Sequence, residues 1–266
     1  MVALEFKEPG EAVLYEKRDQ VVLITLNRPE SLNAINRSLR SELGGAILRF
    51  DKDDDARVAV ITGQGRAFCA GRDLKERADD NAAGVQASAG DSMTEESPYM
   101  WPRTWKPLIA AINGYALAGG WSIAQICDLR LVAEDAHLGI TEARVGLLAP
   151  FGVALAKLIP MAAVMELFLT AEPVTAQRAY DMGFVNKVVP GDKLIDEAMS
   201  MARRIVANSP LSLRCFKELA YRSLNLSTEA ASSLTYEMYQ QLLLSEDSKE
   251  GPRAFAEKRE PQWKGR

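Results

Sequence analysis

The chain begins with two apolar stretches separated by a polar turn. Residues 12–29 read AVLYEKRDQVVLITLNRP, and β-branched residues are dense over 21–25. The polar residues 17–20 interrupt the apolar pattern, which is typical of a turn between two strands. The pattern predicts an N-terminal β-hairpin.

Apolar residues then recur at helical spacing. Steps of four, four and three residues separate Leu39, Leu43, Ile47 and Phe50. These steps place the side chains on one face of a helix. Asn36 and Ser38 are residue types that cap a first turn, so we expect an amphipathic helix that ends near residue 54.

Three short apolar runs have the length of buried strands. They read RVAVIT, LIAAI and LRLVA, at residues 57–62, 108–112 and 129–133. Because strand-like and helical segments alternate, the pattern predicts an α/β fold with a parallel sheet. Residues 78–95 are rich in Ala, Gly, Ser and acids without a clear apolar period, which favours a mobile loop or a weak helix.

The chain changes character after Pro190. Residues 192–266 contain helical segments and almost no strand signal. An all-helical region of this length should therefore follow the sheet-forming region. No low-complexity linker separates the two regions into independent domains.

Composition narrows the class of protein. The chain has 266 residues, 47% hydrophobic, with a formal net charge of -4, which suits a globular protein that binds no nucleic acid. No segment reaches the roughly 18–20 apolar residues of a membrane helix, and no signal peptide is recognisable at the N-terminus. Three cysteines without Cys-x-x-Cys spacing favour a cytoplasmic location, with neither a disulfide framework nor a metal site.

Two glycine-containing stretches are the first candidates for chemistry. Residues 67–76 read AFCAGRDLKE and residues 114–122 read GYALAGGWS. Each places small residues at a strand-to-helix junction, where the first N–H groups of the helix have no intrahelical partner and suit an anion. Two such junctions that converge would form an oxyanion hole. The alternative is a pair of ordinary tight turns, and neither stretch matches the Rossmann or P-loop pattern.

Ser122 is a candidate nucleophile on residue type alone. The surrounding GGWSIA lacks the Gly-x-Ser-x-Gly of a nucleophile elbow. The single histidine, His137, lies beside an expected strand, where a structural role is more common than that of a base. These features disfavour a serine hydrolase.

Several blocks in order resemble the enoyl-CoA hydratase/isomerase, or crotonase, superfamily. They read LNRPESLNAI, VAVITGQGRAFCAGRDLKE, KPLIAAINGYALAGG, CDLRLVAEDAHLGITEARVGLLAPFG and AFAEKREPQWKGR. The resemblance implies a ClpP-like spiral of β-β-α units over residues 1–191, which carries an acyl-CoA site. It implies a helical region over 192–266 that forms a homotrimer, often as a dimer of trimers.

The resemblance also implies a site. The backbone N–H groups of Arg72 and Gly119 would hold the thioester carbonyl, and Phe255 and Lys258 would reach the nucleotide end of a substrate bound to a neighbouring subunit. Trp121 would either flatten the acyl pocket or fill the core. The remaining positions along the coenzyme A channel are Asn33, Ala34, Asp73, Leu74 and Lys75. Coenzyme A is part of the substrate, and no separate cofactor is implied.

Hydratases of this family use two glutamates twenty residues apart. Here the corresponding residues are Ser122 and Glu142, and a serine hydroxyl is a poor acid or base at neutral pH. Ser122 would hold a water or a substrate hydroxyl. Glu142 would be the sole acid/base if burial raises its pKa, and the alternative is a surface carboxylate paired with Arg144. The apolar neighbours expected to bury it are Leu138, Leu147 and Leu148.

Four functions are compatible with this resemblance. Reversible hydration of a 2-enoyl-CoA comes first, and 3-enoyl to 2-enoyl isomerisation follows because GLLAPFG at 146–152 is similar to the isomerases. A hydroxycinnamoyl-CoA hydratase-lyase also pairs a serine with a later glutamate, and Tyr236 or Tyr239 would then contact the phenol. The last is a catalytically weak acyl-CoA-binding protein.

Overall fold

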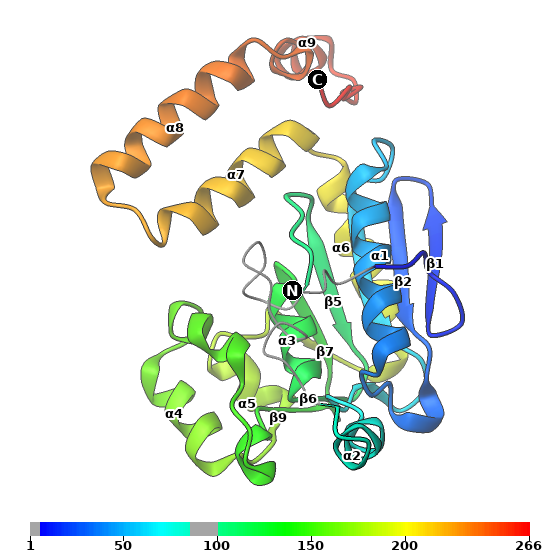
Figure 1. The fold of residues 1–266 in the computed structure, drawn as a ribbon. Coiled ribbons are helices and arrows are strands. Elements are labelled where there is room, and N and C mark those ends of the chain that lie inside the picture. Colours follow the sequence, from blue (N-terminus) through cyan, green and yellow to red (C-terminus); the bar gives the residue numbers. More distant parts are fainter. Residues whose placement is uncertain (1–5, 86–100) are drawn as a thin grey trace.

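A six-stranded sheet forms the centre of the protein (Figure 1), whose computed structural model describes residues 6–85 and 101–266. Its order is β1-β2-β3-β5-β7-β10; β1 and β2 are antiparallel and the other pairs are parallel. The strands are β1 (Val13–Arg18), β2 (Val21–Leu26), β3 (Val58–Gly63), β5 (Leu108–Ile112), β7 (Leu129–Ala133) and β10 (Lys187–Val189). The predicted hairpin and parallel sheet are confirmed.

Helices α1 (Arg37–Lys52) and α6 (Leu194–Val206) cover opposite faces of this sheet, with α1 in front and α6 behind in Figure 1. The Asn36 side chain accepts a hydrogen bond from the Leu39 N–H at 2.9 Å, which is an N-cap. All four residues of the predicted apolar face of α1 are fully buried. The predicted helix is therefore confirmed, including its cap.

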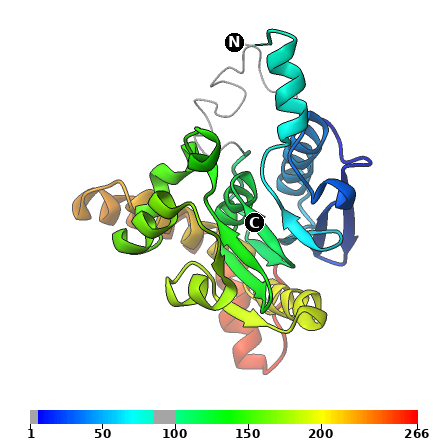
Figure 2. The same cartoon turned by 90° about the horizontal axis from the view of Figure 1, so that it is seen from below.

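A second, smaller sheet has the order β4-β6-β8-β9. Its strands are β4 (Ala67–Cys69), β6 (Tyr115–Leu117), β8 (His137–Gly139) and β9 (Val174–Thr175). The first three are parallel and β9 is antiparallel to β8. Seen from below, these strands lie between the blue N-terminal hairpin and the green helices near residues 150–170 (Figure 2).

Shorter elements complete the core. Helix α3 (Gly119–Ile126) contacts strands of both sheets, and α2 (Leu74–Ala82) occupies the start of the segment expected as a loop or weak helix. Residues 86–95 of that segment lie outside the described residues. The remaining elements are η1 (Pro29–Ser31), η3 (Glu142–Val145), η4 (Pro150–Lys157), α4 (Met161–Thr170), α5 (Ala176–Asp181) and η5 (Gly191–Lys193).

The C-terminal helices form an arm that projects from the core (Figure 1). The arm consists of α7 (Pro210–Ser223), α8 (Thr228–Leu243) and α9 (Glu246–Glu257). Helix α6, which the sequence placed with these helices, instead packs on the large sheet and contributes to its core. Large apolar side chains such as Phe216 and Leu244 are exposed on the arm. No helix in the described part of the chain is long and apolar enough to cross a membrane.

Two acidic residues of α9 hold the last residues of the chain. Asp247 accepts hydrogen bonds from Ser209 Oγ at 3.0 Å and Lys264 N at 2.7 Å. Glu250 accepts from Arg259 Nη1 at 2.6 Å and Gln262 N at 2.7 Å. The Arg259 guanidinium, followed by the Gln262 N–H and Arg253, lowers the pKa of the Glu250 carboxyl.

We expect Glu250→Gln to lower the melting temperature at pH 7, because the amide keeps the shape but loses the charge that binds Arg259. The pKa of Glu250 is lower in the folded protein than the value of about 4.3 in an unfolded chain. The stabilisation that ionised Glu250 contributes is therefore complete above the pKa of the unfolded chain, and it is lost as the pH falls toward the pKa of the folded protein. The difference in melting temperature between variant and wild type should narrow below about pH 4.

Thermal denaturation monitored by circular dichroism from pH 7 to pH 3 measures this difference. Glu257→Gln is the matched control, because Glu257 contacts the same Arg259 at 2.6 Å from a half-exposed position. Its effect should be smaller, as for other exposed ion pairs. A difference in melting temperature between Glu250→Gln and the wild type that stays constant with pH would contradict the stabilising role of the Glu250 charge.

Candidate active site

Three loops meet at one edge of the small sheet. Strands β4, β6 and β8 are parallel, with Cys69 beside Ala116 and Leu117 beside Gly139. The carboxyl ends of parallel strands lie at the same edge, where α/β proteins bind ligands. Arg72 follows β4, Gly119 follows β6 and Glu142 follows β8. The topology therefore places the three groups that the sequence singled out at the same edge of the small sheet.

Backbone N–H groups from the first two loops lie close together. Ile35 and Arg72 form an isolated parallel β-bridge. Ile35 N–H donates to Gly71 O at 2.7 Å and Asp73 N–H donates to Ile35 O at 3.0 Å. In such a bridge the N–H of Arg72 itself points away from Ile35. A methyl group built on Gly119 would lie 3.8 Å from Arg72 N. The N–H of Gly119, the first residue of α3, has no intrahelical acceptor.

Ala118 turns the chain sharply between β6 and α3. Its backbone has φ 51° and ψ -119°, a region that costs an L-residue about 1–3 kcal/mol and that occurs often at functional sites. Its N–H donates to Gly139 O at 2.8 Å and its carbonyl accepts from Ser122 N at 3.3 Å. These bonds hold a conformation in which α3 starts at the sheet edge.

The two glycines of α3 are needed for different reasons. A Cβ on Gly120 would lie 2.1 Å from Cys69 O, so the helix packs directly on the β4 backbone. A Cβ on Gly119 would meet Ile35 Cδ1 at 2.7 Å and Gly71 Cα at 3.7 Å. Gly120 therefore allows close packing, while Gly119 keeps open the space beside the N–H of Arg72.

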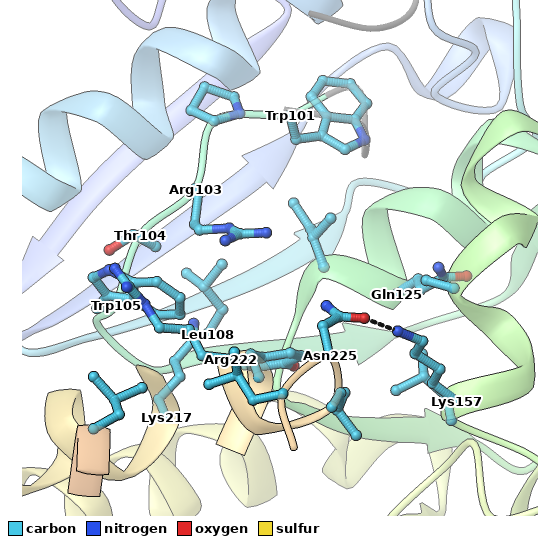
Figure 3. A pocket seen from close by; sticks show the side chains of 18 of the residues that line it. Trp101, Arg103, Thr104, Trp105, Leu108, Gln125, Lys157, Lys217, Arg222 and Asn225 are labelled. Carbon is cyan, nitrogen blue, oxygen red and sulfur yellow. Dashed lines mark hydrogen bonds between the residues drawn. The ribbon is translucent and has the colours of Figure 1, made fainter. Parts of the chain in front are cut away.

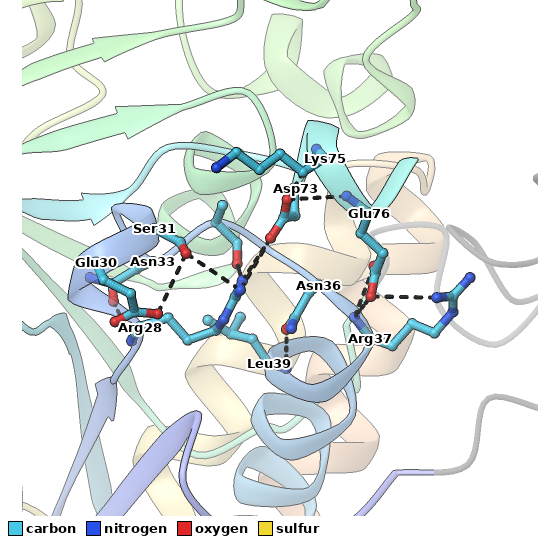
Figure 4. Close-up of polar contacts among 12 residues, drawn as sticks. Arg28, Glu30, Ser31, Asn33, Asn36, Arg37, Leu39, Asp73, Lys75 and Glu76 are labelled. Carbon is cyan, nitrogen blue, oxygen red and sulfur yellow. Dashed lines mark hydrogen bonds and ion pairs between the residues drawn. The ribbon is translucent and has the colours of Figure 1, made fainter. Parts of the chain in front are cut away.

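An ion pair joins the two loops expected to line the coenzyme A channel (Figure 4). Arg28 Nη1 and Nη2 each lie 3.1 Å from Asp73 Oδ2, and Asp73 also caps α2 by accepting from Lys75 N and Glu76 N. Asn33 is fully buried and accepts from Arg28 N at 2.8 Å. Asn33 and Asp73 thus hold the loops through their side chains.

Three further predicted channel residues lie in these loops. Ala34 O accepts from Arg28 Nη1 at 2.5 Å, while Leu74 is 53% exposed and Lys75 is exposed at the start of α2. Leu74 and Lys75 are accordingly accessible from solvent. Arg28 was not among the predicted site residues; its place within LNRPESLNAI was the only signal that pointed to it.

Glu142 begins η3 and is partly buried. Burial raises the pKa of its carboxyl, and in the described chain its Oε2 is buried without a hydrogen-bond partner. The described residues contain no ion pair between Glu142 and Arg144. Leu138 is buried, Leu147 is 36% exposed and Leu148 is 84% exposed, so of the three expected neighbours only Leu148 lies largely in solvent.

Ser122 is engaged within the protein. Its hydroxyl donates to Gly119 O at 2.7 Å and accepts from Trp101 Nε1 at 3.1 Å. His137 Nδ1 instead lies 3.1 Å from Asp135 O. The geometry therefore gives Ser122 none of the partners of a nucleophile. Trp101 lies outside every recognised motif, and nothing in the sequence indicated its contact with Ser122.

Trp121 fills the core. It is fully buried and stacks on Phe184, with ring centroids 4.1 Å apart and planes inclined by 19°. Of the two roles considered from the sequence, the structure places Trp121 in the packing role.

A cavity of about 490 Å³ lies between α3, η4 and the α7–α8 hairpin (Figure 3). Its walls combine aromatic and basic side chains, among them Trp101, Trp105, Lys157, Tyr221 and Arg222. Lys217, also in the wall, pairs with Asp128 at 2.8 Å. Trp101 connects this cavity to α3, because its indole N–H binds Ser122.

Comparison with known proteins decides the family. The enoyl-CoA hydratase/isomerase family model matches residues 16–266. The chain belongs to this family. It is 39% identical to the carnitinyl-CoA dehydratase of Proteus mirabilis (strain HI4320) over 94% of this chain and 97% of the relative. It is 36% identical to the (E)-benzylidenesuccinyl-CoA hydratase of Thauera aromatica, over 95% and 99% respectively.

Solved structures agree. An enoyl-CoA hydratase from Mycobacterium tuberculosis H37Rv superposes with a TM-score of 0.88 at 36% identity, over 97% of this chain and 100% of that one. An enoyl-CoA hydratase from Bacillus anthracis gives 0.89 at 34% identity, over 96% and 100%. The predicted crotonase fold is confirmed, and the protein is an enzyme of the enoyl-CoA hydratase/isomerase family that acts on CoA thioesters.

Four residues that the sequence predicted to contact a substrate lie on the arm of this family member. Helix α9, which carries Phe255, and α2 are at opposite ends of the molecule (Figure 1). Phe255 is 87% exposed, and Lys258 ends α9 in a left-handed conformation. Neither residue therefore approaches Arg72 within one chain. Tyr236 and Tyr239, on α8, are also exposed.

The sequence predicts that the N–H groups of Gly119 and Arg72 bind the thioester oxygen. On that prediction we expect Gly119→Ala, which keeps the N–H but blocks the approach of the oxygen, to reduce kcat/KM for any acyl-CoA substrate by about 100-fold, comparable to the cost of losing one such hydrogen bond. The methyl group would enter the space between Gly119 and Arg72 N. Steady-state kinetics measures the loss.

A second variant separates this effect from misfolding. Ile35→Ala removes the side chain that the new methyl would strike first, so Gly119→Ala/Ile35→Ala should regain the wild-type circular dichroism spectrum but not the activity. Recovery of activity in the double variant would show that only packing was disturbed.

Proposed function

We propose that this enzyme catalyses the reversible hydration of a 2-enoyl-CoA. One observation carries the proposal: the N–H groups of Arg72 and Gly119 and the partly buried carboxyl of Glu142 follow three adjacent parallel strands at one sheet edge. Two donors and one carboxyl are the groups that an enolate reaction needs. The enoyl-CoA hydratases among the similar proteins support this choice.

In this mechanism the thioester oxygen accepts hydrogen bonds from both N–H groups. Ionised Glu142 takes a proton from water while the water oxygen bonds to Cβ, and the π electrons move through Cα to the carbonyl oxygen. The same carboxyl then returns the proton to Cα and the enolate collapses. Each donor stabilises the enolate oxygen by about 3–4 kcal/mol, which lowers the barrier in both directions.

Coenzyme A enters as part of the substrate, and the proposal includes no separate cofactor or metal. A cytoplasmic location, suggested by the cysteine content, remains part of the proposal.

We expect Glu142→Gln to lower kcat for crotonyl-CoA by about 100- to 10,000-fold, the usual contribution of a general acid or base. Wild-type activity should fall as the pH drops through the pKa of Glu142, because only the ionised form accepts a proton. Since burial raises that pKa, the loss should occur above the range of an ordinary carboxyl.

The pH dependence of kcat/KM measures both effects. Arg144→Ala is the control, because Arg144 forms no ion pair with Glu142 among the described residues, and its profile should match that of the wild type. A Glu142→Gln variant with wild-type turnover would refute the proposed role.

Double-bond isomerisation is the second candidate, and Ser122 favours it. With a hydroxyl bound to Gly119 O at this position, Glu142 is the only carboxyl of the family's pair, and one carboxyl suffices to move a proton between Cα and Cγ. A product-resolved assay with crotonyl-, 3-hexenoyl- and feruloyl-CoA separates hydration, isomerisation and hydratase-lyase activity. Thermal stabilisation by these esters without product or deuterium exchange at Cα would indicate a binding protein.

We further propose a homotrimer or a dimer of trimers in which Phe255 and Lys258 reach the nucleotide of a substrate bound to a neighbouring subunit. The exposed position of Phe255 and the separation of α9 from α2 support this arrangement.

Lys258→Gln should raise KM for crotonyl-CoA by about five-fold, because an exposed ion pair contributes up to about 1 kcal/mol. The KM for a crotonyl-pantetheine thioester, which lacks the nucleotide, should not change. Lys249→Gln on the same helix is the control for the loss of a charge from α9. Equal increases for both thioesters would contradict the proposed contact.

A further inference from the structure

A chain of two hydrogen bonds runs from the Trp101 indole to the first turn of α3. Trp101 Nε1 donates to Ser122 Oγ at 3.1 Å, and Ser122 Oγ donates to Gly119 O at 2.7 Å. Both side chains are 1% exposed. The two hydrogen bonds therefore lead to Gly119, the residue whose N–H is proposed to bind the substrate oxygen.

These bonds leave Ser122 little capacity to bind a substrate. A hydroxyl has one hydrogen and two acceptor sites; Gly119 O takes the hydrogen and the indole N–H takes one acceptor site. Ser122 thus has no hydrogen to donate to a water or a substrate hydroxyl in this arrangement. One acceptor site remains, but Ser122 is only 1% exposed, so the observed contacts do not favour the role of holding water.

The position of these bonds suggests another role. They hold the first residue of α3, directly after Ala118 with its strained φ of 51°. The Ser122 N–H also donates to Ala118 O at 3.3 Å, so Ser122 contacts two successive carbonyls of the turn. The bond to Ala118 O comes from the Ser122 backbone and would remain without the hydroxyl, whereas the bond to Gly119 O would be lost. Loss of the hydroxyl would therefore free the Gly119–Gly120 peptide and act on the Gly119 N–H through the backbone torsions of Gly119, which no side chain restricts.

We infer that Trp101 and Ser122 are positioning residues that orient the N–H of Gly119 toward the thioester oxygen. Trp101 also lines the cavity beneath the α7–α8 hairpin, so a group in that cavity would contact the same indole that holds Ser122. This inference rests on the proposed function only in that Gly119 N–H binds an acyl-CoA carbonyl.

Infrared difference spectroscopy tests the orientation of this donor. Butyryl-CoA carrying ¹³C at its carbonyl is saturated, so it binds without being hydrated. A hydrogen bond to the carbonyl lowers its stretching frequency. In Ser122→Ala and in Trp101→Phe, which keeps an aromatic ring, the bound carbonyl band should move toward its frequency in free butyryl-CoA.

Kinetics provides a second readout. Each variant should lower kcat with crotonyl-CoA by about ten-fold, which corresponds to one hydrogen bond, and should change KM less than two-fold. Because the two bonds act in series, Ser122→Ala/Trp101→Phe should lose no more than Ser122→Ala alone. The pH at which kcat/KM falls on the acidic side, which is assigned to Glu142, should not change.

Trp263→Phe is the matched control. The indole N–H of Trp263 donates to Ala207 O at 2.8 Å in the C-terminal region, so this variant loses a comparable bond and should lower the melting temperature without shifting the carbonyl band. An unshifted band in both Ser122→Ala and Trp101→Phe would overturn the inference, and so would additive losses in the double variant. If the wild type hydrates no enoyl-CoA but the band still shifts, the proposed function fails and the positioning role stands.

Discussion

The parallel pairing of β4, β6 and β8 is the constraint on which the site depends. Each strand has only three residues, yet their alignment places the loops that follow them at one edge. The bond from Ala118 N–H to Gly139 O connects the loop after β6 directly to the last residue of β8. Because Gly120 has no side chain, α3 begins against the backbone of β4, and the N–H of Gly119 lies near that of Arg72.

The two positions used by family hydratases as a glutamate pair have different surroundings here. Glu142 is partly buried and its Oε2 has no partner among the described residues, which leaves it available for proton transfer. The Ser122 hydroxyl accepts from Trp101 Nε1 and donates its one hydrogen to Gly119 O. With serine, this position has no carboxyl that could transfer a proton, and its hydroxyl instead bonds the first residue of α3.

Much of the fold was predictable because its signals are local. The spacing of apolar residues in α1 and the cap at Asn36 determine a helix without reference to the rest of the chain. The short second sheet was not predicted, because strands such as β8 are too short to show a period and are formed only by pairing. The place of α6 in the core depended on the apolar sheet face that it covers, which sequence periodicity alone does not identify.

The sequence by itself determined the family, and it predicted the two glycine-containing junctions and Arg72, Gly119 and Glu142 as site residues, since these predictions depend on residue type and order. Only the tertiary structure decided what surrounds them. It showed that Trp121 packs in the core and that Glu142 has no ion pair with Arg144 among the described residues. It also showed that the Trp101 indole N–H donates a hydrogen bond to the Ser122 hydroxyl. Burial and hydrogen-bond partners come from segments far apart in the chain, so the sequence of one loop cannot contain them.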